Sequence, residues 1–286
     1  MRRILLRPIR TALLCLAVCG GLTAWPGPGA AQAGQPREFW IAPESYQIDP
    51  GDQLVAYLRA GRHFEGENLG FSAGGLHRFE LLCGDTKIPV EGDSGDMPAV
   101  RLEVGEEGLA RIIHESSGPA VLWSDWSDFE SFVRARDFPW AIEDHRDRGL
   151  PEDGFRQSAQ RYAKALIAVG NGAGEDRAAG LEAEIVALAN PYADDISQGL
   201  PLLVLYQGKP LKSARVTVQS RGADGQVTRR VRWTDMDGKL TVRTRPGTEY
   251  LVDAVVLRPL SGSVKNNTPV WEALWASLTF RTPDPT

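Results

Sequence analysis

Cysteine is scarce in this sequence, with three residues among 286. Two of them, Cys15 and Cys19, lie in an N-terminal segment that we expect to be removed, so Cys83 would be alone in the mature chain. A single cysteine cannot close a disulfide within the chain, which excludes a fold stapled by disulfides. We therefore predict that Cys83, in the string Phe-Glu-Leu-Leu-Cys, is a small buried apolar side chain.

Long apolar runs and an excess of positive charge are also missing. No stretch after residue 33 approaches eighteen consecutive apolar residues, so we expect no membrane span in the mature chain. The formal net charge is −5, and it falls to −9 without residues 1–33, which contain four arginines and no acidic residue. Because phosphate binding needs a basic face, a chain this acidic is not expected to bind nucleic acid.

The N-terminal segment has the features of an export signal. Arginines at its start are followed by the apolar run 11–22 and by Ala31-Gln32-Ala33, a small-x-small cleavage pattern. We predict cleavage after Ala33 and a periplasmic or secreted location. The string Arg2-Arg3-Ile-Leu-Leu-Arg7 also resembles a twin-arginine signal, so the general and the twin-arginine export routes both stay open.

Short apolar runs between turn residues predict strands through most of the mature chain. In its first part these strands are expected within 37–60, around a turn at 49–52, and then at 78–83, 100–104, 108–114 and 120–123.

Residues 125–136 break this pattern, because Trp126, Phe129 and Val133 stand at helical spacing after Asp125 or Ser127 as a cap. Further helical pieces are expected at 140–148 and 152–161. Periodicity allows either state for 162–169, of which we favour a strand that returns to the first sheet, with 181–188 as its partner.

The last ninety residues have the clearest strand pattern. Strands at 202–206 and 214–218 flank a turn around Pro210, and Asp237-Gly238 suits a tight hairpin with positive φ. Alternate positions of the strand at 202–206 predict that Leu203 and Leu205 face the core. The final run, 271–280, is too apolar for a free tail, so we predict a buried closing strand in which Leu278 and Phe280 share the core face and Glu272 has a partner. Taken together, the chain is predicted to be mainly β, with two β-sandwich domains of immunoglobulin-like or carboxypeptidase-regulatory-like type. These are 34–194, with a helical insertion at about 125–160, and 199–286.

A catalytic site is not expected. The string Gly92-Asp93-Ser94-Gly95-Asp96 resembles the nucleophile segment of trypsin-like proteases, but Ser94 comes too early in the chain for that fold. Asp96 also stands where a glycine would help to form the oxyanion hole. We interpret this string as a turn.

One string could hold a metal. In extended backbone His63, Glu65 and Glu67 would point to the same side, as a divalent transition metal site could use. A solvated strand end, with Gly66 at a bulge or turn, explains the same residues. Both interpretations stay open.

Eight strings resemble, in the same order, a family of exported bacterial proteins of unknown function. They are Glu38-Phe-Trp-Ile-Ala-Pro43, Tyr46-Gln-Ile-Asp-Pro-Gly51, Gly61-Arg-His-Phe-Glu-Gly-Glu67, Arg161-Tyr-Ala-Lys-Ala-Leu166 through Val169-Gly170, Asn190-Pro191, Gly208-Lys-Pro-Leu211, Thr234-Asp-Met-Asp-Gly238 and Trp271-Glu-Ala-Leu-Trp-Ala-Ser-Leu-Thr-Phe280. Members are often described as NikM-like or as the periplasmic component of cobalt/nickel uptake.

The resemblance implies a periplasmic accessory or binding protein with two β-rich domains and a part in nickel or cobalt uptake, without enzymatic activity. A membrane transporter or an outer-membrane receptor would be its partner. Family members commonly carry a histidine just before the Phe-Trp pair, where this chain has Arg37-Glu38. The alternative is an envelope interaction module that binds a transporter or an envelope polymer without metal.

Overall fold

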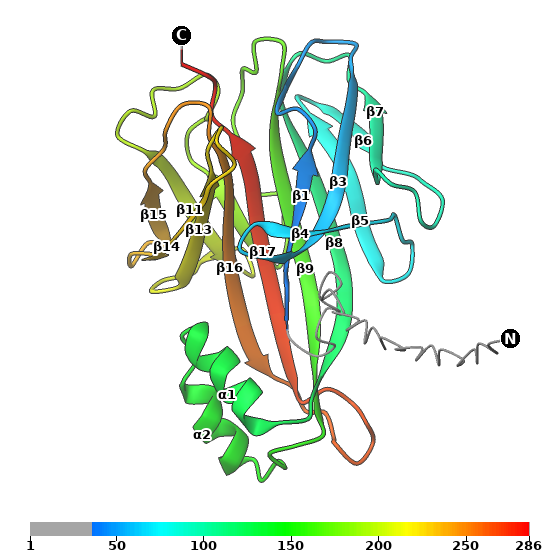
Figure 1. Ribbon diagram of the computed structural model, residues 1–286, viewed down its shortest axis with the longest axis vertical. Coiled ribbons are helices and arrows are strands. Elements are labelled where there is room, and N and C mark those ends of the chain that lie inside the picture. Colours follow the sequence, from blue (N-terminus) through cyan, green and yellow to red (C-terminus); the bar gives the residue numbers. More distant parts are fainter. Residues whose placement is uncertain (1–35, 286) are drawn as a thin grey trace, which may run out of the picture. The chain divides into compact units, whose positions relative to one another are not determined.

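The computed structural model describes residues 36–285, and a nine-stranded sheet runs through its middle (Figure 1). In spatial order its main path is β14 (Val227–Trp233), β13 (Arg215–Arg221), β16 (Glu249–Pro259), β17 (Trp271–Arg281), β9 (Phe155–Val169), β8 (Gly108–Trp123), β5 (Leu76–Cys83) and β6 (Thr86–Pro89). The short β2 (Gln47–Ile48) pairs with β9 beside this path. The predicted signal peptide 1–33 and its cleavage site lie outside the described residues.

The middle of this sheet is a parallel pair, in which β17 runs beside β9 from Trp271↔Gln157 to Thr279↔Ala165. The other neighbours along the main path are antiparallel. Residues 271–280 of β17 are all buried, because β17 has strands on both sides and layers on both faces. The predicted closing strand is therefore confirmed, and Leu278 and Phe280 share one core.

Two smaller sheets cover the large one. The first consists of β1 (Glu38–Pro43), β3 (Gln53–Arg62), β4 (Glu65–Leu69) and β7 (Val100–Glu103). The second consists of β10 (Ala183–Ala187), β11 (Leu200–Tyr206), β12 (Lys209–Pro210) and β15 (Lys239–Val242).

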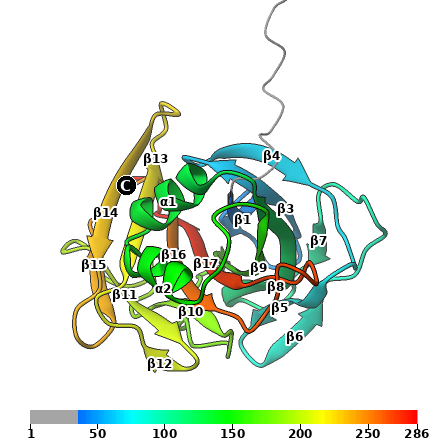
Figure 2. The same ribbon diagram turned by 90° about the horizontal axis from the view of Figure 1, so that it is seen from below.

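These two sheets lie on opposite faces of the nine-stranded sheet (Figure 2). On β8, Ile112 packs in the core under the first small sheet, whereas its neighbour Ile113 packs in the core under the second. On β9, Ala163 and Tyr162 divide in the same way. Successive side chains of a strand point to opposite faces, so the apolar character of both sets makes β8 and β9 a shared middle layer.

The only two helices of the described residues, α1 (Trp126–Ala135) and α2 (Trp140–Asp147), lie at one end of the sheet, at the bottom of Figure 1. The Asp125 carboxylate caps α1 by accepting the backbone N–H of Ser127 at 2.7 Å. Phe129 and Val133 then face a core that includes Trp271. The helices predicted at 125–136 and 140–148 are confirmed.

The mainly β fold is confirmed. The predicted boundary between two domains, at residues 194–199, lies between β10 and β11, and these two strands pair with each other from Ala183↔Tyr206 to Ala187↔Leu202. The nine-stranded sheet also takes strands from both sides of the boundary. Residues before 194 and after 199 thus share two sheets.

Three local predictions were wrong. Residues 152–161 are not a third helix, and the helical insertion ends before β9 begins at Phe155. Residues 181–188 do not pair with β9, because β10 pairs with β11. Asp237-Gly238 does not close a hairpin: Gly238 has the expected positive φ of 72°, but the strands it joins, β14 and β15, lie in different sheets.

Two further predictions concern Cys83 and membrane spans. Cys83 is a free, buried cysteine, as predicted. None of the helices formed by residues 36–285 has the length and apolar character needed to cross a membrane.

Candidate anion-binding site

The predicted metal residues lie at a hairpin. His63 and Phe64 form the two-residue turn between β3 and β4, and both have positive φ, 55° and 62°, as a type I′ turn requires. His63 is therefore not in extended backbone, which was the premise of the predicted set. Gly66 is not at a bulge either, because it pairs directly with Gly61 across the hairpin.

The two carboxylates of the predicted metal set, Glu65 and Glu67, lie in different surroundings. Glu65 is exposed, and Glu67 pairs with the Arg37 guanidinium at 2.6 Å. Among residues 36–285 no group of three or more histidine, cysteine, aspartate and glutamate side chains is arranged to hold a metal ion. Metal binding at His63, Glu65 and Glu67 stays a prediction.

The rejected nucleophile string is an exposed turn. The backbone N–H of Asp93 donates to the Asp96 carboxylate at 2.8 Å, and the Asp96 N–H donates to the Asp93 carbonyl at 3.0 Å. Asp96 thus closes the turn around Ser94.

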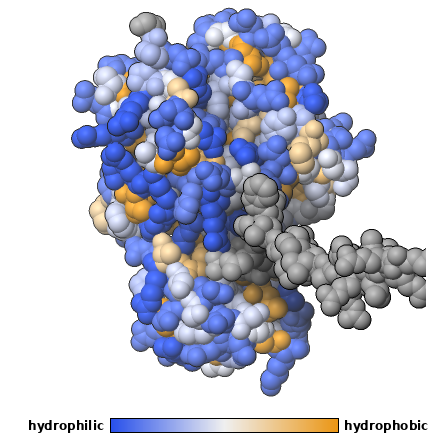
Figure 3. All heavy atoms as spheres, in the orientation of Figure 1, coloured by the Kyte–Doolittle hydropathy of each residue, from blue (hydrophilic) through white to orange (hydrophobic). Residues whose placement is uncertain are grey.

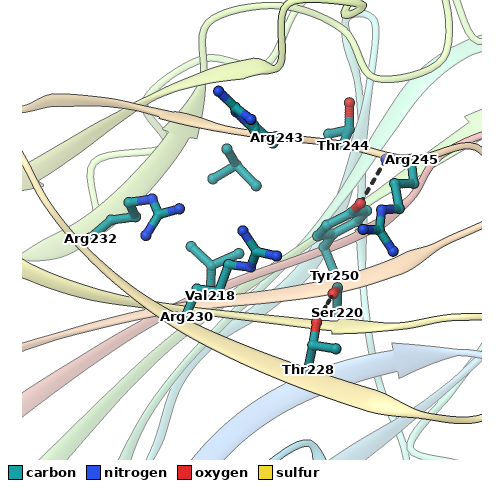
Figure 4. Close-up of a pocket in the computed structure, with 10 residues that line it drawn as sticks. Val218, Ser220, Thr228, Arg230, Arg232, Arg243, Thr244, Arg245 and Tyr250 are labelled. Atoms are coloured by element: carbon teal, nitrogen blue, oxygen red, sulfur yellow. Dashed lines mark hydrogen bonds between the residues drawn. The ribbon is translucent and has the colours of Figure 1, made fainter.

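A different site lies between two sheet edges. The strand β14 is one edge of the nine-stranded sheet, and β15 is an edge of the second small sheet. Between them is a cleft of about 280 Å³ (Figure 4). Its lining residues are Val218, Ser220, Thr228, Arg230, Arg232, Val242, Arg243, Thr244, Arg245 and Tyr250.

The register of β14 explains why two of these arginines face the cleft. Arg230 pairs with Val218 and Arg232 pairs with Val216 on β13, so both arginines point to the face on which these valines are buried. Directly paired residues in a sheet project to the same side. At the edge strand this face is no longer covered, and the guanidinium groups occupy the opening. Arg229 directly precedes Arg230 in sequence and, since neighbouring residues of a strand alternate, points to the opposite face.

The other two arginines come from the segment after β15. Figure 4 shows Arg243 and Arg245 on the side of the cleft opposite Arg230 and Arg232. The Tyr250 hydroxyl accepts the backbone N–H of Arg245 at 2.8 Å and so holds this segment against the sheet. Burial raises the pKa of Tyr250, which keeps the hydroxyl protonated at neutral pH.

The cleft has cations without counter-ions. It is lined by four arginines and no aspartate or glutamate. Several arginines outside the cleft are paired, as Arg221 is with Glu249 at 3.1 Å. Within residues 36–285 the structure shows no ion pair for any of the four cleft guanidinium groups. Unopposed guanidinium groups at one place create a positive potential that attracts anions, even on a protein that is acidic as a whole.

Sequence reasoning missed this site. The net charge of −9 suggested that the chain has no basic face, which is wrong at this cleft. The available signal was local: Arg229-Arg230-Val-Arg232 and Arg243-Thr-Arg245 are two arginine-rich strings with ten residues, 233–242, between them.

In comparisons with known proteins, one family model matches most of the chain. The model described as Domain of unknown function (DUF4198) matches residues 35–258. None of the curated proteins matches the chain.

Two solved structures show a distant similarity. One is a tetra-tandem repeat in the extending region of a large adhesion protein, at 10% identity over 86% of this chain and 49% of that chain, with a TM-score of 0.20. This chain thus spans about half of that one. The other is the D0–D1 domain of intimin, at 12% identity over 85% of this chain and 97% of that chain, also with a TM-score of 0.20. Scores this low carry no inference about function.

Proposed function

Because the chain belongs to the DUF4198 family of unknown function, its function must be inferred from its own sites, and we propose that it is a non-enzymatic binding protein of the bacterial envelope. Its arginine cleft binds a phosphate-bearing envelope polymer. The observation that carries this proposal is the set of four arginines that line one cleft without a carboxylate among them.

Guanidinium chemistry favours phosphate as the recognised group. A guanidinium can donate two parallel hydrogen bonds to a phosphate, and four of them suit a ligand that brings several negative charges. Hydroxyl groups of Ser220, Thr228 and Thr244 line the same cleft. Thr244 donates to the Ile196 carbonyl at 3.3 Å, and Ser220 and Thr228 bond each other at 2.8 Å, which leaves one proton of that pair to donate to a ligand. The face drawn in Figure 3 is mostly hydrophilic with scattered apolar spots, in keeping with recognition by charge.

A binding measurement with inorganic tripolyphosphate tests this proposal. Calorimetry at low salt should show saturable binding that weakens as the salt concentration rises, because salt screens exposed charges. Replacing both Arg230 and Arg232 by glutamine should weaken binding at least tenfold. Arg229→Gln is the matched control, since this side chain leaves the same strand on the opposite face.

The outcome distinguishes the cleft from general charge effects. If tripolyphosphate does not bind, or if Arg229→Gln weakens binding as much as the double variant, the proposed site is wrong. Polygalacturonate, a carboxylate polymer, serves as a second probe. If it binds as tightly as tripolyphosphate per charge, the preference for phosphate is wrong.

Nickel or cobalt uptake, the role implied by the NikM-like resemblance, is the other proposal for this chain. The depression beside His63 is lined by Arg62, Arg136 and Arg229 as well as by Glu38 and Asp128. Three cations near a single imidazole disfavour a divalent metal, which makes this the weaker proposal. Nickel chloride at 100 times its dissociation constant should raise the free energy of unfolding by about 2.7 kcal/mol if the metal role is correct. An unchanged unfolding midpoint would exclude it.

A further inference from the structure

A second pocket opens between the first small sheet and strands β8 and β9 of the nine-stranded sheet. The arginine cleft lies elsewhere, at the β14 edge of that sheet. The second pocket has a volume of about 360 Å³, within the range of small-molecule sites. One wall comes from the first small sheet and is apolar, with Phe39, Leu58 and Leu69. The other wall is formed by β8 and β9 and carries His114, Ser116 and Arg161.

Arg161 is a cation without an acceptor. Within residues 36–285 the structure shows no hydrogen bond or ion pair from its guanidinium, whose only close partner is the ring of Phe39, at 4.6 Å from the central carbon. Burial, and to a lesser extent the charge of Arg37, lowers the pKa of Arg161 to about 10, so the group is still charged at neutral pH. Arg37 does not compensate it, since Arg37 itself pairs with Glu67.

The backbone leaves room for this guanidinium. Gly118 on β8 lies beside it, and a Cβ atom at this position would stand 2.9 Å from the Arg161 Nε atom. Any side chain at Gly118 would therefore push the guanidinium out of its place. Gly118 also marks the point where the pairing of β8 with β9 becomes irregular.

His114 supplies a second polar group with unused hydrogen-bonding capacity. Its side chain is 3% exposed, and its Nδ1 atom has no partner. The ring is held between Phe39, at 5.0 Å, and Phe79, at 4.8 Å between centroids. The Nδ1 atom is therefore a hydrogen-bonding group that a molecule in the pocket can use.

We infer that this pocket binds a small monocarboxylate with a compact apolar body. The carboxylate accepts hydrogen bonds from Arg161, whose fork of donors matches two carboxylate oxygens. Neutral His114 lies on the same wall and provides a further hydrogen bond. Phe39, Leu58 and Leu69 cover the apolar part of the ligand. The lining contains no aspartate or glutamate that would compete for the guanidinium.

The inference is independent of the arginine cleft, and benzoate is the probe that tests it. Binding to the whole protein can be followed by the chemical shifts of the ligand and by calorimetry. Benzoate should bind in the millimolar range or better, and benzamide, which has the same shape without the charge, should bind at least tenfold more weakly. Equal binding of benzoate and benzamide would overturn the inference.

Variants locate the binding to this pocket. Arg161→Gln should weaken benzoate binding at least tenfold, whereas Arg229→Gln, which lines neither this pocket nor the arginine cleft, should leave it unchanged. Gly118→Ala should weaken it through displacement of the guanidinium, and it tests the site even if Arg161→Gln fails to fold. Benzoate binding that persists unchanged in a folded Gly118→Ala protein, or that is lost in Arg229→Gln, would place the ligand elsewhere.

Discussion

Replacing Trp275 by alanine should destabilise the protein strongly. Its side chain is 5% exposed and sits on the face of the large sheet that carries the helices. The guanidinium of Arg136 lies over the indole at 4.5 Å, and the ring of Phe132 approaches at 6.4 Å. Arg136 is in turn fixed by Asp253 at 3.0 Å. The alanine variant would therefore lose a packed ring and leave a partly buried cation without its aromatic partner.

The expected loss follows from these contacts. Truncation of a buried tryptophan to alanine costs about 3–5 kcal/mol, of which the cation–π contact supplies about 0.5–2 kcal/mol. Trp275→Phe keeps an aromatic face under Arg136 and should lose less. The matched control is Trp233→Ala, because Trp233 is 56% exposed. Its indole N–H donates to Asp137 at 3.2 Å, so we expect a loss within about 1 kcal/mol.

Urea unfolding followed by far-ultraviolet circular dichroism measures both losses. This signal arises mainly from the backbone, so it reports unfolding in both variants. The free energies of unfolding should differ between Trp275→Ala and Trp233→Ala by at least about 2 kcal/mol. A loss under about 1 kcal/mol in Trp275→Ala, or equal losses in the two variants, would show that the ring is not packed as described.

Three further changes test other parts of the structure. Lys164→Met should cost about 3–5 kcal/mol in urea unfolding, because it leaves the buried carboxylates of Asp176 and Glu184 without their cation; a loss near zero would contradict this burial. His114→Phe should flatten the dependence of stability on pH. Burial lowers the pKa of His114 from 6.5 to about 3, so between these values the unfolded state binds one more proton and stability falls as pH falls, by about 1.4 kcal/mol per pH unit. Urea midpoints at pH 6 and pH 4 should therefore differ less in the variant than in the wild type, and equal differences would refute the assignment. Asp125→Ala removes the cap of α1 and should cost about 1 kcal/mol, measured in the same way, whereas no change would mean that the cap contributes nothing.

The sequence predicted a helix or strand correctly where the residues that determine it lie within that same element. Helix α1 combines an aspartate cap with aromatic residues at helical spacing, and both signals act within one turn or two. The strand 271–280 was predicted because its tryptophans and Leu278 had to be buried. The partner expected for Glu272 is present as well, since the Arg258 guanidinium donates to it at 2.7 Å.

The orientation of β11 was wrong because its sequence carries no alternation. Leu202-Leu203-Val204-Leu205 is apolar at every position, so either set could face the core. Leu203 and Leu205 were expected there, but Leu202 and Val204 lie in the core under the second small sheet, while Leu205 is buried outside this core and Leu203 is half-buried. Continuous apolar runs are typical of strands with two covered faces, and such runs do not determine which side chain points where.

The arginine cleft could not be predicted because it depends on the stacking of two sheets. Residues 228–232 lie on β14 of the nine-stranded sheet and 243–245 follow β15 of the second small sheet, and nothing in either string shows that these two edges meet. The same reason explains the incorrect hairpin at Asp237-Gly238, the turn that leads from one sheet to the other. Total charge averages over the whole surface and therefore hides a local group of cations.

The parallel pairing of β17 with β9 determines when, during synthesis, the nine-stranded sheet can be completed. During synthesis β9 leaves the ribosome long before β17, which is the last strand along the sequence. Until β17 arrives, β9 has an open edge in what will be the middle of the sheet, and β16 has no link to it. Open strand edges pair readily with other chains. The nascent chain is therefore prone to aggregation in the interval before β17 is made, and delaying folding until β17 is available would protect it.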